Sequence, residues 1–220
     1  MTNPYVGEIV PIIRNDAGLY DGNLIHYFRV VFLKSQNIRN AYHNLRHMLH
    51  VLWLCYQAVL FYQKTKTPLR RHQVSVLLIA ALFHDYDHSG QLGEDDLNIE
   101  RAIRGLKKNL LDEDMDIFEE IVDCIRPTQY PHVRPSAELT LSQQILRDAD
   151  MSQALSVAWL QQVVVGLATE WSKSPLDVLR AQGGFHRNLT FSTAWANEMF
   201  PPAVIEAKIA EAEALLGFLE

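Results

Sequence analysis

Hydrophobic residues recur at three- and four-residue spacing through most of the chain, and the alternation typical of a β-strand is nowhere sustained. This periodicity predicts an all-α fold. A polar stretch at 37–40 and a loop at 64–68 separate the first helices. We expect helices over 24–34, 43–63, 70–85, 96–109 and 114–125, one or two helices over 136–171, a short helix after Pro175, a segment around 185–200 and a final helix from Ala203.

The segment 70–85 has a different pattern, because the residues from Val74 to Phe83 are apolar on almost every side of the predicted helix. Such a helix lies at the centre of a bundle rather than on its surface. His84-Asp85-Tyr86-Asp87-His88 follows at once, so it leaves the core where that helix ends. Its charged groups should be paired or metal-bound, since a buried charge without a partner is strongly unfavourable. Interaction with the helix dipole would explain the histidines but not Asp85.

Two further clusters carry polar side chains of the same kinds. His43 and His47 are four residues apart, which places them on one face of the helix predicted there; the alternative is a helix start with exposed imidazoles. Asp148 and Asp150 interrupt another apolar helical pattern, and the alternative is a pair that caps the following helix. Taken together, the imidazoles and carboxylates predict a mixed nitrogen and oxygen site for a divalent metal with positions left for water.

Water on such a metal loses a proton near neutral pH, so the site suits hydrolysis of a phosphoester. The sequence contains no glycine-rich phosphate loop, no Gly-x-Ser-x-Gly elbow and no His-Glu-x-x-His helix. We therefore expect a metal-dependent phosphohydrolase.

Composition narrows the class of protein. With 220 residues, 48% of them hydrophobic, the chain can bury the core of one domain, which we expect to cover 1–220. The net charge of −6 and the lack of a basic run argue against a nucleic acid polymer as partner. Cys55 and Cys124 lie in apolar patterns and predict buried thiols. The longest apolar run is too short for a bilayer, so we expect no membrane partner and a cytoplasmic location.

In their order along the chain, the motifs resemble those of the HD-domain superfamily, and more closely a shortened cyclic nucleotide phosphodiesterase catalytic domain. Five segments carry the resemblance and span 42–185. They are Tyr42-His43-Asn44 with His47 (Tyr-His-Asn-x-x-His), His84-Asp85-Tyr86-Asp87-His88-Ser89-Gly90 (His-Asp-x-Asp-His-Pro-Gly), Thr128 to His132 (Thr-Asp-Met-x-x-His), Ala149-Asp150-Met151-Ser152 (Ala-Asp-Leu-Ser) and Gln182-Gly183-Gly184-Phe185 (Gln-x-x-Phe). The implied fold is an HD-type helical bundle with the metal site at its centre and C-terminal helices, 186–220, packing on the core.

The resemblance also implies roles for single residues. The first metal would have His47, His84, Asp85 and Asp150 as ligands, and Asp85 would bridge to a second metal held otherwise by water. The expected cofactors are thus two divalent ions of Zn, Mg, Mn or Fe. His43 would be the general acid, and His88 would orient the bridging water. The expected substrate is a small nucleotide-like phosphoester, contacted by Gln182, Phe185, His132 and Gln153.

Some assignments stay open. Gln182 and Phe185 either hold and stack a base or pack in the core, and Asp148 either orients a ligand or is structural. Four arginines lie near the motifs in sequence and are candidates to meet phosphate: Arg46, Arg126, Arg134 and Arg147.

The chain departs from the family pattern at several points. Ser89 replaces a proline, Gln129-Tyr130 replaces Asp-Met, Gln153 replaces the usual asparagine, and no Leu-Glu-Asn-His-His segment follows the second motif. The stretch between Asp150 and Gln182 is also shorter than in the family. This shortening predicts an incomplete wall around a bound nucleotide.

Our leading hypothesis is therefore a phosphohydrolase acting on a nucleotide, with a 3′,5′-cyclic nucleotide as its most specific form and a nucleoside monophosphate as the alternative. A second hypothesis is a di-iron oxygenase on the same scaffold, which needs further histidines; His132 is the obvious candidate outside the motifs. A third is a module that binds metal or nucleotide without turnover.

Overall fold

The computed structural model describes residues 18–19 and 23–219, and its regular elements in this part are all helical. The predicted all-α fold is confirmed. The predicted domain covers 1–220, and of these residues 1–17, 20–22 and 220 lie outside the described part. The α-helices are α2 Leu24–Lys34, α3 Leu45–Tyr62, α4 Arg71–Phe83, α5 Asp95–Asn109, α6 Phe118–Ile125, α7 Leu141–Met151, α8 Gly166–Glu170, α9 Pro175–Asn188, α10 Ala194–Met199 and α11 Pro202–Leu219. Short 3₁₀ segments lie at Gln36–Arg39, Asp112–Ile117, Arg126–Thr128, Ser136–Glu138 and Ser152–Leu155, and a π-helix covers Leu160–Val165.

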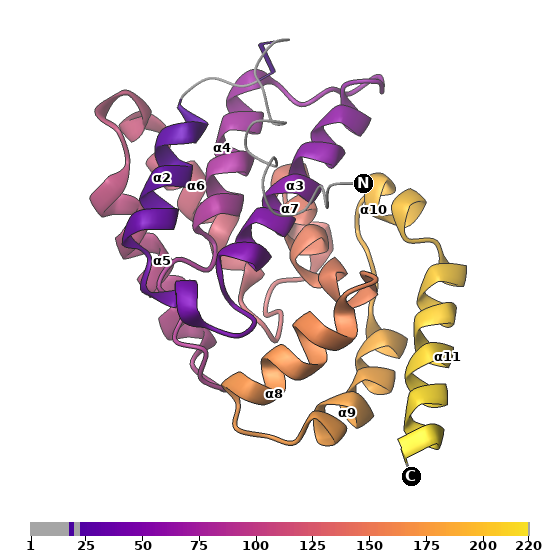
Figure 1. The fold of residues 1–220 in the computed structure, drawn as a ribbon. Helices are drawn as coiled ribbons and strands as arrows, with labels where there is room; N and C mark the ends of the chain where they lie inside the picture. The colour runs from indigo at the N-terminus through magenta and orange to yellow at the C-terminus, as the bar shows by residue number, and fades with distance from the viewer. Residues whose placement is uncertain (1–17, 20–22, 220) are drawn as a thin grey trace, which may run out of the picture.

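Helix α4 is the centre of the main bundle. Every residue from Val74 to Phe83 is buried, and the helix contacts α2, α3, α5, α6 and α7 (Figure 1). The prediction of a central helix is confirmed. Its C-terminal end is the point where His84 and Asp85 leave the apolar core.

A second, smaller hydrophobic cluster forms around the buried Trp159. It joins the π-helix, α8, α9 and α11, which lie together in the lower half of Figure 1. Helix α10 instead packs on α3 and α7, with Trp195 in the main cluster. The C-terminal residues thus divide between two clusters, and α11 packs along α9 rather than on the main core.

Several predicted helix limits differ from the structure. The acidic segment predicted to open a helix at Asp114 is a 3₁₀ turn up to Ile117, because the Asp114 side chain turns inward to accept a hydrogen bond from the Tyr27 hydroxyl. The stretch predicted as one or two helices over 136–171 is broken further, with α7 ending at Met151. The helix after Pro175 runs for 14 residues and is not short.

Other expectations from composition have structural counterparts. Cys55 and Cys124 are buried free thiols, as predicted, and burial raises the pKa of Cys124 to about 12. No single helix among the described residues is long and apolar enough to cross a membrane. The segments Leu141–Leu155 and Leu160–Glu170 meet that test only as a pair, and they are bent by 97°.

The packing of α5 on the segment after α4 depends on a glycine. A Cβ atom built on Gly105 would lie 2.2 Å from the ring of Tyr86, which is buried. We expect Gly105→Ala to lower the free energy of unfolding by about 1–3 kcal/mol, because the ring or the helix must move. Urea unfolding measures this change. Gly217→Ala in α11 is the control, since nothing lies within 4 Å of the added atom; an equal loss in both variants would contradict the explanation.

Candidate metal centre and the cavity around it

Four predicted metal ligands converge where α3, α4 and α7 meet. His47 lies in the first turn of α3, His84 caps α4, Asp85 follows it, and Asp150 lies in the last turn of α7. The Nε2 atom of His47 is 3.3 Å from Nε2 of His84, 3.2 Å from Oδ2 of Asp85 and 3.0 Å from Oδ1 of Asp150. His84 Nε2 lies 3.5 and 3.6 Å from the same two carboxylate oxygens. The structure thus brings the predicted quartet together.

The outer nitrogens of both imidazoles face hydrogen-bond acceptors. His47 Nδ1 is 2.6 Å from Oε1 of Gln153, and His84 Nδ1 is 2.9 Å from the carbonyl oxygen of Ala81. Because both partners accept, each Nδ1 donates a hydrogen bond, and in the neutral form that binds a metal the lone pair of each ring is on Nε2. These contacts orient the two histidines as metal ligands usually are oriented.

The charges of the quartet fit a divalent cation. Burial alone would raise the pKa of Asp85, but the neighbouring His84 and His47 hold it well below its usual range. Burial would lower the pKa of His47, but Asp150 and Asp85 raise it to about 10. The Oδ2 atom of Asp85 is buried without a hydrogen-bond donor. Two carboxylates and two imidazoles whose Nε2 atoms face the same point are a donor set suited to a divalent metal.

Asparagine side chains hold the first two motifs against each other. The Nδ2 amide of Asn37 donates to the backbone oxygens of His43, at 2.7 Å, and Asp85, at 2.8 Å. Asn40 donates in the same way to the oxygen of His88, at 2.9 Å. The polar stretch predicted as a simple break between helices therefore fixes the segments that carry the site.

His43 lies before α3 and not on it, because Asn44 is the N-cap that accepts from the backbone N–H groups of Arg46 and His47. The expectation that His43 and His47 share a helical face is therefore wrong. His43 still lines the cavity beside Asp85.

Glu170, at the end of α8, positions His43. One carboxylate oxygen accepts the Nδ1–H of His43 at 2.7 Å, and the other accepts the backbone N–H groups of Tyr42 and His43 at 2.6 and 2.8 Å. Burial lowers the pKa of His43, and the hydrogen bond to Glu170 opposes that shift. Sequence reasoning missed Glu170, because 127 residues separate it from His43. The one available signal was an acid two residues after the apolar Leu167-Ala168 pair and directly before Trp171.

The ring of His88 packs against the ring of His43. The two rings are stacked with centroids 3.7 Å apart and an interplanar angle of 16°. The Gly90 N–H donates to Nδ1 of His88 at 2.9 Å, and the side chain of Asn98 lies 3.0 Å from Nε2. His88 is buried, outside the residues that line the cavity. The structure thus places His88 against the ring of His43, and its expected role in orienting water stays a prediction.

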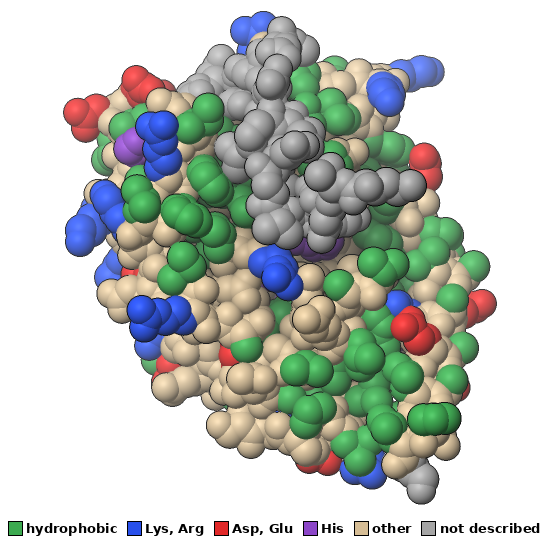
Figure 2. Space-filling view, viewed as in Figure 1, with side chains coloured by type: hydrophobic (Ala, Val, Ile, Leu, Met, Phe, Trp, Pro, Cys, Tyr) green, Lys and Arg blue, Asp and Glu red, His purple; other side chains and the backbone are tan. Residues whose placement is uncertain are grey.

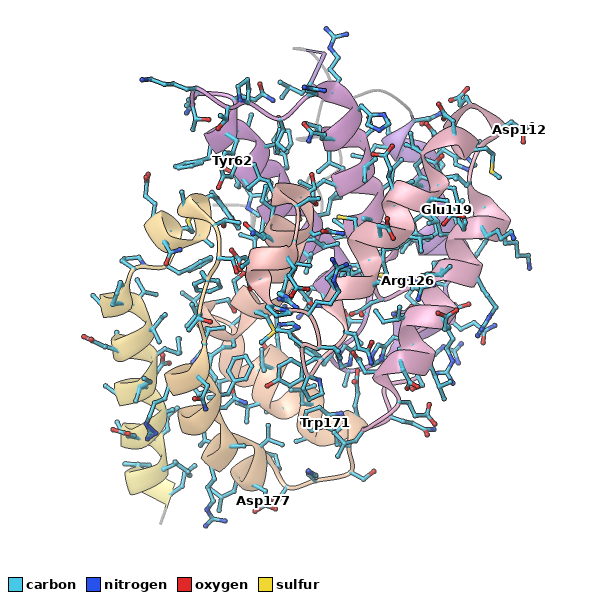
Figure 3. The ribbon with its side chains drawn as sticks, turned by 180° about the vertical axis from the view of Figure 1, so that it is seen from behind. Tyr62, Asp112, Glu119, Arg126, Trp171 and Asp177 are labelled. Carbon is cyan, nitrogen blue, oxygen red and sulfur yellow. The ribbon has the colours of Figure 1, made fainter. Side chains whose placement is uncertain are left out.

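A cavity of about 500 Å³ opens from the metal ligands toward α9. Gln182 and Phe185 line it as predicted, and the Oε1 atom of Gln182 is buried without a hydrogen-bond partner. Val163 and Leu167 form the opposite wall, and Trp171 and Asp177 lie toward its α8–α9 end (Figure 3). Whether this wall encloses a bound nucleotide completely stays a prediction. The π-helix and α8 supply the wall despite the shorter chain.

Two expected substrate contacts lie elsewhere. Gln153 is 1% exposed and joins His47 to Gln162, whose Oε1 accepts from its amide at 2.6 Å. It orients a candidate ligand instead of meeting substrate. His132 is outside the cavity lining, with Nδ1 3.1 Å from the backbone oxygen of Gln129, so it supplies neither a substrate contact there nor the extra ligand of an oxygenase.

Asp148 is structural. It lies inside α7 and does not cap the helix that follows, which was the alternative expected from the sequence. Its carboxylate accepts hydrogen bonds from the N–H and the hydroxyl of Thr193, at 2.8 and 2.7 Å, and from the N–H of Ser192. These contacts fix the start of α10 against α7. None of the four candidate arginines lines the cavity. Arg147 is buried and donates to the backbone oxygens of Pro127 and Arg134. Arg126, directly after α6, forms an ion pair with Glu100 of α5, and Arg46 and Arg134 are exposed.

We expect Gln153→Leu to weaken metal binding about 10–100-fold, because His47 loses the acceptor that sets its tautomer. Titration of the metal-free protein with Mn²⁺ or Zn²⁺ measures the dissociation constant. Asp150→Ala is the positive control and should remove binding. Gln161→Leu, an exposed neighbour in the π-helix, is the matched control and should bind as the wild type does. Equal affinity in the Gln153 variant would contradict the orienting role.

Comparison with known proteins agrees with this geometry. Residues 42–94, which carry His43, His47, His84 and Asp85, match the model of the 3′5′-cyclic nucleotide phosphodiesterase family. A search of curated proteins found no match. The fold is similar to the crystal structure of the phosphodiesterase domain of Salpingoeca rosetta rhodopsin phosphodiesterase, with a TM-score of 0.62 and 16% sequence identity over 96% of this chain and 86% of that one. The chain therefore has the fold of a phosphodiesterase domain, and its first two motifs match the family's model.

Proposed function

We propose that the protein hydrolyses a 3′,5′-cyclic nucleotide in a metal-dependent reaction. The observation that carries the proposal is the quartet of His47, His84, Asp85 and Asp150 at one end of a cavity that His43 also lines. The cavity volume of about 500 Å³ suits a nucleotide-sized molecule. The family match over residues 42–94 supports the same reaction.

The quartet would hold a divalent ion, with Asp85 also contributing to a second ion if two are bound. Zinc, magnesium, manganese and iron all suit a mixed imidazole and carboxylate set. A divalent ion supplies Lewis acidity to the phosphate and lowers the pKa of water at the site.

His43 would donate the proton that the leaving group needs. Its Nδ1–H is held by Glu170, so the proton that it exchanges with substrate is on Nε2. The oxygen of water adds to phosphorus, the bond from phosphorus to the 3′ oxygen breaks, and that oxygen takes the proton. The product is a nucleoside 5′-monophosphate. Glu170 and the stacked His88 hold the imidazole in place during the transfer.

The α9 side of the cavity would bind the base. Gln182 presents an amide with an unpartnered oxygen, which can hydrogen-bond the edge of a purine. Phe185 lies one helical turn further on and offers an aromatic face. The aliphatic Val163 and Leu167 line the same cavity and would pack on the base from α8 and the π-helix.

The proposal predicts turnover of adenosine or guanosine 3′,5′-cyclic monophosphate that depends on added Mn²⁺, Mg²⁺, Zn²⁺ or Fe²⁺. Asp85→Ala should reduce the rate to background, because the ion loses a ligand. Asp116→Ala, an exposed aspartate in the 3₁₀ turn, is the matched control and should keep wild-type rates. Product release by chromatography is the measurement. Wild-type turnover no higher than that of Asp85→Ala overturns the proposal, and turnover of nucleoside monophosphate alone replaces it with a phosphatase.

The role of Glu170 predicts a pH effect. Glu170 raises the pKa of His43, so its removal lowers that pKa, and the protonated acid is then lost at lower pH. We expect Glu170→Gln to lower kcat and to move the alkaline limb of the kcat/KM profile to lower pH. Glu198→Gln on α10 serves as the exposed control. A lower rate with an unchanged alkaline limb would contradict the role of His43 as acid.

A further inference from the structure

A second cavity, of about 320 Å³, lies on the outer face of the bundle between the end of α2 and α5. It shares no lining residue with the cavity at the candidate metal centre. Four basic side chains line it: Lys34, Arg101, Arg104 and Lys108. Figure 2 shows lysine and arginine side chains gathered on this face, at the left of the view.

The basic residues meet because of helix geometry. Arg101, Arg104 and Lys108 are three and four residues apart and so lie on one face of α5, while Lys34 comes from the last turn of α2. Gly105 lies between them on α5, against the Tyr86 ring. The Tyr86 ring fills the space that a side chain at position 105 would take, so Gly105 and Tyr86 form the less polar part of the cavity lining.

Internal contacts leave much of this charge unneutralised. Asp87 is the one acidic residue in the described lining, and its Oδ1 already accepts the backbone N–H of Gln36 at 2.7 Å. Arg101 is engaged by Glu94 and Asn98, whereas the exposed Arg104 and Lys108 have no side-chain partner among the described residues. The helix dipole favours a cation at Lys34 and at Lys108, which lie in the last turns of α2 and α5. It does not account for the exposed Arg104 beside them, and close cations repel one another.

We propose that this cavity binds a phosphate-bearing small molecule with at least two phosphate groups. Four cations against two carboxylates, Asp87 and the Glu94 that pairs with Arg101, favour a multiply charged anion, and the arginine guanidinium groups suit phosphate oxygens. A volume of about 320 Å³ is sufficient for a diphosphate or triphosphate group. The acidic chain as a whole is unsuited to a nucleic acid polymer, so the ligand is a small molecule.

The test uses the metal-loaded protein and two probes, inorganic pyrophosphate and adenosine 5′-triphosphate, each with excess Mg²⁺ so that the probe does not remove the bound metal. Calorimetric titration gives the stoichiometry and the dissociation constant. We expect one binding event that survives in Asp85→Ala and is lost, or weakened about tenfold or more, in Arg104→Gln/Lys108→Gln. Binding of both probes identifies the shared phosphate chemistry, and binding of the nucleotide alone assigns the site to nucleotides.

Two controls separate a built site from general charge. Lys64→Gln/Lys66→Gln removes two positive charges from exposed positions in the loop after α3, and this variant should still bind the probe. Lys107→Gln is the neighbour of Lys108 outside the cavity lining and should also keep it. Circular dichroism and the unfolding temperature verify that the double variant is folded. An unchanged event in Arg104→Gln/Lys108→Gln, its loss in the charge-matched control, or binding to RNA or anionic vesicles but to neither probe would overturn the proposal.

Discussion

Two carboxylates and two imidazoles share a desolvated volume at the end of α4, and the arrangement around it follows from that constraint. Polar atoms in this volume have little access to water as a hydrogen-bond partner, so they pair with one another. Nε2 of His47 lies within 3.2 Å of carboxylate oxygens of both Asp85 and Asp150. The same constraint requires acceptors for the outer nitrogens, which Gln153 and the Ala81 carbonyl supply. A buried helix end thus concentrates charge that a cation can neutralise.

The cavity forms because two hydrophobic clusters meet at this charged point. The main cluster around α4 supplies Ile99, the cluster around Trp159 supplies Val163 and Val178, and the candidate metal ligands lie where α4 ends. The bend of 97° between the segments that end at Leu155 and begin at Leu160 turns the chain back over the site. One end of the cavity therefore carries the candidate metal ligands, and the other combines aliphatic side chains with the amide of Gln182.

Supporting side chains distinguish an ordered site from a set of nearby ligands. Glu170 accepts hydrogen bonds from two backbone N–H groups and from the ring of His43, so it fixes both the backbone and the side chain of that residue. His88 stacks on the opposite side of that ring. Arg104 and Lys108, in the basic cavity between α2 and α5, have no such side-chain partners among the described residues. This difference from the candidate metal centre favours a bound ligand as their partner.

The sequence by itself determined the helical class and the central place of α4, because hydrophobic periodicity encodes both features. The grouping of His47, His84, Asp85 and Asp150 followed from the resemblance of the ordered motifs to a known family. Only the tertiary structure decided that Glu170 holds His43, that Gln153 orients a ligand instead of meeting substrate, and that Asp148 anchors α10. Each of these contacts joins residues 44 or more positions apart. No pattern of spacing reports such a pairing, since it depends on how separate helices pack.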